Sequence, residues 1–491
     1  MPRYEFSEGS SNKFWDITLS GKSFTTTYGK IGANGQTTIK SFKSDADAKK
    51  EHDKVVAEKT KKGYVLVGGK AKPGKAEKAE AKPNGKAKAG KAPVAEVTGK
   101  RDARNKDLEA AIIANPSDRE AYTVFADWLQ EQGDPRGELI SLQLGYKEGQ
   151  AKKLIEQHAD YFLGPLAAHQ KVYDEGGNNG GSHLRSTAQQ KEWEKIQTQA
   201  FLWRNGYIYR VRLSHDEYQS NTGDGPAFEG SIAEILEQVF DHPSGRYVVE
   251  LAFMSNGDPN ENDLQDIIDV IGKKAPPTVR KITFGDNVDQ ISWHHTGSLA
   301  KMWKGVPNLR TLEMETGEFD VGKMAAPALE RAIFITGGLA KSAGKGIATA
   351  AMPKIKHLEI YYGTDNYGGD CTVKDVKPLL DRTDLKDLTY LGLKNSEFAN
   401  ALAAAVGGAK ILKGLKTLDL SLGTMTDEGA ASLAAAKESL KHLEVLDLTR
   451  NYLTKAGIAA VKGICPKVIT DRQEKADDDG DEAYYYTAIA E

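Results

Sequence analysis

Two stretches late in the chain decide the fold: LKTLDLSLGTMTDEGAAS at residues 415–432 and LEVLDLTRNYLTKAGIAA at residues 443–460. Both open with the apolar spacing L-x-x-L-x-L, and both continue into Thr-x-x-Gly. Each of these positions in the second stretch lies 28 residues after its counterpart in the first. The apolar triplet predicts a strand, and the small-residue segment after Thr-x-x-Gly predicts a helix. One strand and one helix cannot bury their apolar side alone, so copies of this unit must stack around a shared core.

Weaker copies of the same apolar triplet precede these two stretches. They begin at Ile208, Val248, Val279, Leu309, Leu329, Ile355 and Leu388. Their spacing varies from 20 to 40 residues, which indicates insertions between units. We therefore predict an α/β solenoid of strand–helix units over residues 206–470.

The triplet followed by Asn451, the 28-residue period and the Thr-x-x-Gly-Ile-Ala-Ala-Val helix resemble the leucine-rich repeat of the ribonuclease-inhibitor-like class. The last two units match this pattern best. Upstream, Gly423 and Ser396 stand where asparagine would bond the loop, and Ala332 replaces a leucine. The resemblance implies a solenoid that binds a protein partner.

Side chains alternate along a strand, so the residues between the leucines face the concave side of the solenoid. The candidate protein-binding residues on this face are Glu313, Glu315, His357, Glu359, Tyr361, Asp419 and Asp447. Five of them are carboxylates on neighbouring strands, which favours a basic partner through electrostatic steering. The alternative is that these acidic residues only keep the surface hydrated.

The first 67 residues predict a small β-rich unit, because aromatic and β-branched residues alternate with turns. Strands are expected over residues 14–19, 23–28 and 37–42, and a helix over residues 46–62. The signature Tyr28-Gly29-Lys30, with Phe14-Trp15 upstream and a lysine-rich closing helix, resembles the WGR domain over residues 3–64.

That resemblance implies contact with nucleic acid through Tyr28, Gly29, Lys30, Lys40 and Lys43. Tyr28 would stack on a base or sugar at a strand end, and Lys30 would neutralise a phosphate. The remaining lysines would add salt-dependent affinity through counterion release. The alternative is that Tyr28 only packs within the sheet and that the domain docks a protein.

Residues 68–104 are dominated by Lys, Ala, Gly and Pro, which predicts a flexible basic linker. Residues 1–104 contain 23 Lys and Arg against 12 Asp and Glu, whereas residues 105–491 contain 43 against 57. The basic front indicates either an acidic partner or a contact with the acidic body of the chain. The linker itself is either a tail that follows DNA or a soluble spacer.

Residues 105–205 predict a helical domain. Ser117 and Glu120 form a capping box, and a helix follows with an apolar face of Tyr122, Phe125, Ala126 and Leu129. Asp134 caps a further helix, with Pro135 at its first position. The segments ADWL at 126–129 and GDPRGE at 133–138 resemble the bacterial repeat-companion domain, a helical domain that precedes repeat arrays and has no known chemistry.

Residues 471–491 form an acidic tail that contains the tyrosine run Tyr484-Tyr485-Tyr486. Its composition favours disorder. The alternative is that the tyrosines dock on the last repeat as a cap.

No constellation of catalytic or metal-ligating residues stands out, so we expect neither an enzyme nor a cofactor. The glycine-rich run at 337–346 fails the spacing of a phosphate loop. Cys371 and Cys465 cannot build a disulfide framework, the N-terminal residues lack an apolar signal core, and no apolar run reaches the ~20 residues of a membrane span. These features predict a cytoplasmic protein, and the resemblance to the bacterial repeat-companion domain implies a bacterial one.

We predict a non-enzymatic interaction scaffold, in which the solenoid binds a protein and the WGR-like domain contacts DNA or RNA. The first alternative is a purely protein-binding module without nucleic-acid contact. A minor alternative is a GTPase regulator, by resemblance to a eukaryotic protein with similar repeats and an acidic tail.

Overall fold

The computed structural model describes residues 3–8, 11–30, 36–61, 65–66, 102–174, 183–184, 186–193, 199–214, 231–254, 264–285, 290–478 and 483–490. The chain divides into two compact units, one with residues 1–96 and 145–147 and one with residues 97–144 and 148–491.

The first unit is a five-stranded antiparallel sheet with one helix. In sheet order its strands are β4 (Gln36–Ser41), β3 (Ser23–Lys30), β2 (Ser11–Ser20), β1 (Arg3–Glu8) and β5 (Val65–Leu66), and its helix is α1 (Asp45–Lys61). Trp15, Ile17 and Phe24 form the core together with Val55 of α1. The predicted helix and three strands are confirmed. β1 is not among the predicted strands, although Tyr4 and Phe6 alternate with polar residues, and β5, with two residues, is too short to show a pattern.

The second unit begins with a group of helices. They are α2 (Lys106–Ala114), α3 (Arg119–Glu131), α4 (Pro135–Leu144), α5 (Glu148–Gln157), α6 (Ala159–Phe162), η1 (Gly164–Leu166), α7 (Ala167–Asp174) and α8 (Thr187–Trp193). The predicted apolar face of α3 is buried. The predicted cap is wrong by one residue, because Asp118 rather than Ser117 accepts the N–H of Glu120, at 2.9 Å. A carboxylate at that position also favours the helix dipole.

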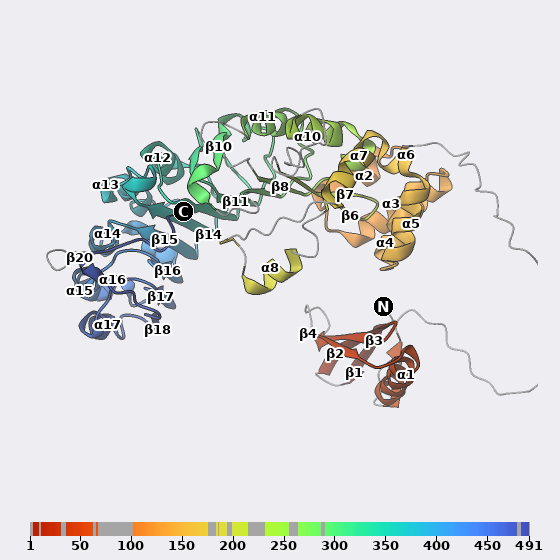
Figure 1. Cartoon of the computed structure of the whole chain (residues 1–491), viewed down its shortest axis with the longest axis horizontal. Helices are drawn as coiled ribbons and strands as arrows, with labels where there is room; N and C mark the ends of the chain where they lie inside the picture. The colour runs from red at the N-terminus through yellow and green to blue at the C-terminus, as the bar shows by residue number, and fades with distance from the viewer. Residues whose placement is uncertain are drawn as a thin grey trace, which may run out of the picture. The chain divides into compact units, whose positions relative to one another are not determined.

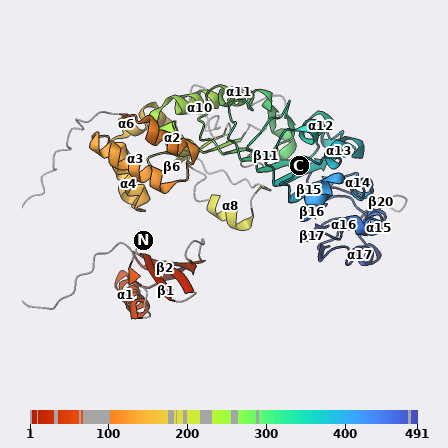
Figure 2. The same cartoon turned by 180° about the vertical axis from the view of Figure 1, so that it is seen from behind.

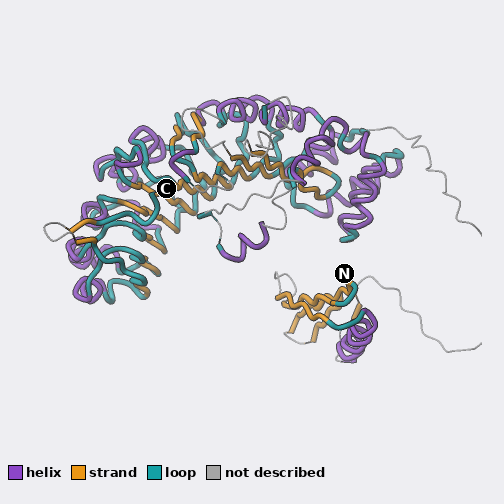
Figure 3. Tube along the Cα trace, in the orientation of Figure 1, coloured by secondary structure: helices purple, strands orange, loops and turns teal. Residues whose placement is uncertain are grey.

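An eleven-stranded sheet forms the rest of the second unit. In sheet order its strands are β18 (Lys467–Ile469), β17 (Val445–Asp447), β16 (Thr417–Asp419), β15 (Tyr390–Ser396), β14 (His357–Gly363), β13 (Arg331–Ile335), β11 (Thr311–Glu315), β9 (Lys281–Phe284), β8 (Glu250–Met254), β7 (Tyr207–Ser214) and β6 (Phe201–Arg204). Neighbouring strands pair in parallel, except that β6 pairs with β7 antiparallel. Figure 3 shows these strands as a continuous orange band.

Helices connect successive strands and lie along the outer side of this sheet, whereas the strands line the inner side (Figures 1 and 2). The helices that follow β7 are α10 (Ile232–Asp241), η2 (Pro243–Gly245), α11 (Gln265–Lys274), η4 (Leu299–Lys301), α12 (Lys341–Thr349), η5 (Asp365–Tyr367), α13 (Val373–Leu380), α14 (Ala399–Val406), η6 (Lys410–Gly414), α15 (Asp427–Ala435), α16 (Lys437–Leu440) and α17 (Lys455–Val461). The short helix η3 (Ile291–Trp293) differs, because its Ile291 packs with Ile333 and Ile335 on the opposite side of the sheet. Two small sheets pair β10 (His295–Ser298) with β12 (Glu318–Asp320), and β19 (Asp477–Asp478) with β20 (Ala483–Tyr484).

Every predicted apolar triplet leads into a strand of this sheet. The first residue of each triplet is buried, from Ile208 through Leu388 to Leu443. Ala332, which replaces a leucine, is buried as well. Burial of one side of each strand therefore defines the unit more generally than leucine itself does.

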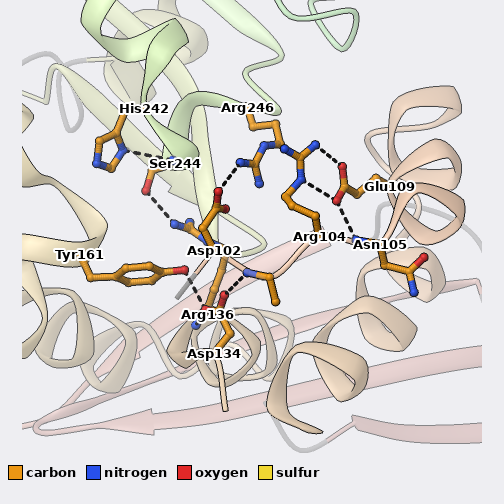
Figure 4. Close-up of polar contacts among 11 residues, drawn as sticks. Asp102, Arg104, Asn105, Glu109, Asp134, Arg136, Tyr161, His242, Ser244 and Arg246 are labelled. Carbon is orange, nitrogen blue, oxygen red and sulfur yellow. Dashed lines mark hydrogen bonds and ion pairs between the residues drawn. The ribbon is translucent and has the colours of Figure 1, made fainter. Parts of the chain in front are cut away.

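A buried polar cluster joins the helices to the first strands of the sheet (Figure 4). The guanidinium of Arg136, a residue only 1% exposed, donates to the Gly206 carbonyl at 2.6 Å and to Ser244 Oγ at 3.1 Å. It also lies 4.6 Å from the ring centroid of Tyr207. Asp134 caps α4 as predicted, accepting the N–H of Arg136 at 2.9 Å. Because these groups come from α4, β7 and η2, the cluster fixes the helices against the sheet.

This cluster corrects the end of the predicted linker. Asp102 pairs with Arg246 at 2.9 Å, and the Ala103 N–H donates to Asp134 at 3.1 Å. Arg104 pairs with Glu109 at 2.6 Å. Residues 102–104 are therefore part of the folded unit, because two charged side chains and one backbone N–H find partners here that composition does not reveal. Residues 68–101 of the predicted linker lie outside the described residues.

Candidate protein-binding face and nucleic-acid contact

Parallel pairing places the predicted face residues in straight rows across the sheet. The acidic row consists of Glu313, Glu359, Asp419 and Asp447, with Ile333 and Gly392 on the intervening strands. The basic row, two residues earlier on each strand, consists of Lys281, Arg331 and His357, followed by Tyr390. The alternate residues Leu312, Leu358 and Leu418 belong to the core on the helix side. Both rows therefore lie on the opposite side of the sheet, which we call the open face.

Cations of the basic row pair with carboxylates of the acidic row. Lys281 Nζ lies 2.5 Å from Glu313, and Arg331 Nε lies 3.5 Å from the same carboxylate. Arg331 Nη2 also lies 3.9 Å from Glu359. This pairing reduces the negative charge that Glu313 and Glu359 present to a partner. The open face is therefore a mixed charged surface, and the steering expected from five carboxylates is weakened.

An aromatic pair lies beside these ions. The His357 and Tyr390 rings stack with centroids 4.0 Å apart. His357 Nε2 lies 2.6 Å from Glu359 Oε1, and the Tyr390 hydroxyl donates to Asp419 Oδ2 at 2.7 Å. Because each ring is held at its polar end, the pair presents a rigid, flat surface on the open face.

Lys394 of β15 lies between two carboxylates, with Nζ 3.4 Å from Glu359 and 3.1 Å from Asp419. Its ammonium also lies 5.0 Å from the ring centroid of Tyr361. Burial lowers the pKa of Lys394, but Asp419, Tyr361 and Glu359 outweigh burial and hold that pKa above its ordinary value. The sequence analysis missed Lys394, although the triplet at Leu388 places it on the open face.

Asp419 and Asp447 also have a local structural role. Asp419 accepts the N–H of Ser421 and Asp447 accepts the N–H of Thr449, each at 2.9 Å. Such turns stabilise the chain where it leaves the strand. Asp419 and Asp447 therefore also stabilise the repeat itself, a role that neither partner binding nor surface hydration includes.

Glu315 is fully buried, because residues from a distant part of the chain cover it. Its carboxylate accepts the His183 N–H at 2.9 Å and lies 2.5 Å from His183 Nδ1. The hydrogen bond to Glu315 raises the pKa of His183, although burial opposes it. Nothing in the sequence links these residues, which are 132 positions apart.

The candidate nucleic-acid residues lie on β3 and β4 of the first unit. Tyr28 is 41% exposed and lies opposite the buried Trp15 on the neighbouring strand. Gly29 and Lys30 continue β3, where Lys30 pairs with Lys13 of β2. Tyr28 thus extends the aromatic surface of the core to the solvent, where a base or sugar can stack on it.

Lys40 and Lys43 lie away from Tyr28. Lys40 is opposite Phe24, four residues along β3 from Tyr28, which is about 13 Å. Its ammonium pairs with Glu51 of α1 at 3.2 Å. Lys43 is exposed just before α1. The structure therefore separates these two lysines from the signature residues instead of gathering all five at one point.

Other candidates for chemistry are absent from the described residues. Among them no group of three His, Cys, Asp or Glu could hold a metal ion. Cys371 and Cys465 are buried free thiols, and burial raises the pKa of Cys371 to about 12. None of the helices in the described part of the chain has the length and hydropathy of a membrane span.

Comparison with known protein families identifies two kinds of domain in this chain. Residues 3–70 match the WGR domain family, and residues 415–434 and 439–462 match a leucine-rich repeat family. The chain therefore carries a WGR domain at its start and leucine-rich repeats near its end, as predicted.

Two proteins of Escherichia coli (strain K12) are similar to part of this chain. The uncharacterized protein YfeS is 40% identical over 62 residues, and protein YehF is 40% identical over 65 residues. Each match covers 13% of this chain and 25% or 24% of the relative, so the chain spans about a quarter of their length.

Two solved structures are also similar. A protein from Bacteroides fragilis is 20% identical, with a TM-score of 0.45 over 96% of this chain and 97% of that protein. An internalin from Listeria monocytogenes is 12% identical, with a TM-score of 0.25 over 47% of this chain and 69% of that protein.

Proposed function

We propose that this protein is a non-enzymatic interaction scaffold. A leucine-rich-repeat solenoid over residues 206–470 binds a protein partner on its open face. A WGR domain at residues 1–67, on a linker that ends near residue 101, brings a second ligand. The helices of residues 105–205 act as a repeat-companion domain that closes the start of the solenoid, and residues 471–491 follow it as an acidic tail.

The two rows of the open face carry this proposal. Charged side chains, a stacked His357–Tyr390 pair and Lys394 lie together on one surface, and the helices lie on the other. A surface with fixed rings and ions of both signs offers geometric specificity more than bulk charge attraction. We therefore propose recognition of a folded or extended protein surface of mixed charge, instead of a strongly basic partner.

The test is capture of binding proteins from bacterial extract by the full chain, quantified by mass spectrometry. Thr417→Arg with Val445→Arg adds bulk and charge to the open face, at half-exposed positions of β16 and β17. Ala431→Arg, at an exposed position of α15 on the helix side, is the matched control. Partners that bind the open face are lost in the double variant and retained in the control. Equal capture by both would contradict the proposal.

A second function is favoured by the exposure of Tyr28. We propose that the WGR domain stacks this ring on a nucleic-acid end, while Lys30 contributes phosphate contact. The alternative of protein docking by the same domain predicts no such binding.

Fluorescence anisotropy of the full chain with a nicked, 5′-phosphorylated duplex separates the two alternatives. Stacking predicts that Tyr28→Ala weakens binding about 5–100-fold, whereas Tyr28→Phe retains it. Lys49→Ala, an exposed lysine of α1, controls for loss of charge. Loss of affinity that is equal for Tyr28→Ala and Lys49→Ala would indicate only unspecific charge, and no binding at physiological salt would favour protein docking.

A further inference from the structure

Residues 483–490, which we call the return segment, run back over the open face of the sheet. In Figures 1 and 2 the end of the chain lies beside the middle of the sheet instead of beyond β18. The disorder predicted for the acidic tail is therefore wrong for these residues. Docking of the tyrosines is confirmed in part, because the Tyr485 ring packs edge-on against Tyr452 of the last repeat at 5.0 Å. The segment then continues past that repeat.

Four residues bind the backbone of the return segment: Tyr452, Leu422, Ser292 and Asn395. The Tyr452 hydroxyl accepts the N–H of Tyr486 at 2.9 Å and donates to its carbonyl at 3.0 Å. The Leu422 carbonyl accepts the N–H of Ala488 at 3.0 Å. Ser292 Oγ donates to the Ala490 carbonyl at 3.1 Å. Such hydrogen bonds bind an extended main chain, and they do not depend on most of its side chains.

Asn395 makes the most specific of these contacts. Its side chain is fully buried, and its amide accepts the N–H of Ile489 at 2.9 Å while donating to the carbonyl of the same residue. Asn395 stands at the end of β15 with φ 54°, a left-handed conformation that asparagine tolerates better than most residues. The Asn395 side chain thus pairs with both the N–H and the carbonyl of Ile489.

An apolar pocket receives the Ile489 side chain, which is only 7% exposed. The pocket consists of Ile291, Ile333, Ile335 and Tyr361, with Leu184 and Leu422 at its edge. Ile333 and Ile335 lie beside Glu313 and Glu315 in the rows of the open face, so β13 places an apolar patch between charged strands. This cluster is distinct from the core on the helix side of the sheet.

Gly337 allows the segment to approach closely. A Cβ at this position would lie 1.9 Å from the Ala490 carbonyl oxygen, and its three nearest atoms all belong to Ala490. Because Gly337 has no side chain, the backbone of the return segment can lie against it. This close approach indicates a groove shaped for a main chain.

We propose that this groove is a binding site for an extended polypeptide segment with a branched aliphatic residue between small residues, and that residues 483–490 occupy it in cis. This inference rests on the proposed function of the open face as a protein-binding surface. Main-chain contacts supply affinity, the Ile489 pocket supplies selectivity, and the tethered segment competes with any partner because its effective concentration is high. Release of the return segment would expose the site.

The test uses the full chain and a fluorescent peptide with the sequence of residues 483–491. Ile489→Asp removes the anchor of the occupant and leaves the groove unchanged. We expect this variant to bind the peptide at least about tenfold more tightly than the wild-type chain, which must first release its own segment. A peptide with Asp in place of Ile is the matched control and should not bind.

Gly337→Ala added to Ile489→Asp locates the binding, because its Cβ would clash with the backbone of Ala490 in the bound peptide. Loss of binding in this double variant supports the proposal. Absence of binding to Ile489→Asp, or equal binding by all three chains, would overturn it. Wild-type self-association that Ile489→Asp abolishes would also overturn it, because a second copy would then supply the segment.

Failure of this inference and failure of the proposed function can be told apart. Thr417 and Val445 lie outside the groove, so capture of partners that depends on them can persist when the peptide fails to bind. Conversely, peptide binding by Ile489→Asp can occur while capture is unaffected by the Thr417 and Val445 changes.

Discussion

Strands β7 and β17 occupy opposite parts of one sheet, yet different interactions stabilise them. Near β7, the guanidinium of Arg136 holds the Gly206 carbonyl and Ser244 at the centre of a buried polar cluster. Near β17, Leu418 and Leu446 lie side by side in the core. Asn451 bonds the loop there, donating to the Leu420 and Leu448 carbonyls and accepting the Met425 N–H.

The strand–helix array is therefore anchored by one polar cluster near β7 and built from equivalent apolar contacts near β17. A buried charge is costly when one partner is lost, so the first region depends on a single residue. Repeated leucines share stability among neighbouring units, so the second region loses it in increments. The two regions should therefore respond differently to the loss of one side chain.

The largest effect is expected for Arg136→Met. It leaves the Gly206 carbonyl and neighbouring polar groups buried without their donor, which should cost about 3–5 kcal/mol. Hydrogen exchange should accelerate in residues 201–254 before it does in residues 415–470. Arg310→Met, an exposed residue, should cost less than about 1 kcal/mol. Equal effects of the two changes would remove the contrast between the regions.

Leu446→Ala is the corresponding change in the regular region. The side chain is fully buried, and its truncation should cost about 2–5 kcal/mol. Chemical denaturation of this variant and of Leu418→Ala should give values close to each other, because the two residues are equivalent neighbours. A Leu446→Ala effect that spreads to β7 would show that the sheet unfolds as one unit.

Asn451→Ala should have a smaller effect, about 1–3 kcal/mol, because it leaves buried backbone groups without partners. Asn451→Asp keeps an acceptor for Met425, but it turns a buried carboxylate oxygen toward the Leu420 and Leu448 carbonyl oxygens. Thermal melting at neutral pH should therefore place Asp below Ala, because an unpaired buried charge costs more than an unmade hydrogen bond. A melting temperature of Asn451→Ala equal to that of the wild type would mean that the loop bonds are dispensable, as the substitution by Gly423 one repeat earlier already suggests for that unit.

The pH dependence should also differ along the sheet. Burial and the charge of Arg136 lower the pKa of His242 to about 4, and its Nδ1 accepts the Ser244 N–H. The unfolded chain binds this proton at about pH 6.5, so stability near β7 should fall as pH falls from about 6.5 to 4. Melting temperatures of His242→Asn should lose this part of the pH dependence. A wild-type curve that is flat over that range would contradict the prediction.

His183 should behave in the opposite sense, with the smallest effect. Its raised pKa means that the contact with Glu315 is fully present below about pH 6.5 and is lost as pH rises through the folded value. Proton NMR of the His183 ring should show titration above that of the free residue. His183→Gln should remove this signal without moving the His242 transition, and titration at or below pH 6.5 would contradict the assignment.

The local parts of the fold could be predicted from sequence and the long-range parts could not. The L-x-x-L-x-L spacing predicts the burial of Leu415 and Leu443. The alternation of side chains along a strand predicts that Glu313 and Glu359 lie on the open face. Nothing local marks His183 as the partner of Glu315, or Ile489 as the occupant of a pocket built from residues far earlier in the chain. Composition assigns Asp102 and Ala103 to the linker because their partners, Arg246 and Asp134, lie far away in sequence.

The short last strand of the sheet has a consequence for sheet growth. β18 contains three residues, and its first, Lys467, is exposed. An exposed edge can template pairing with another chain, and short length and lysine are two of the devices by which proteins prevent that. At the other edge, Trp203 of β6 packs against the cluster of Leu139, Leu154 and Phe162. Both edges of the sheet are thus protected against pairing with another chain.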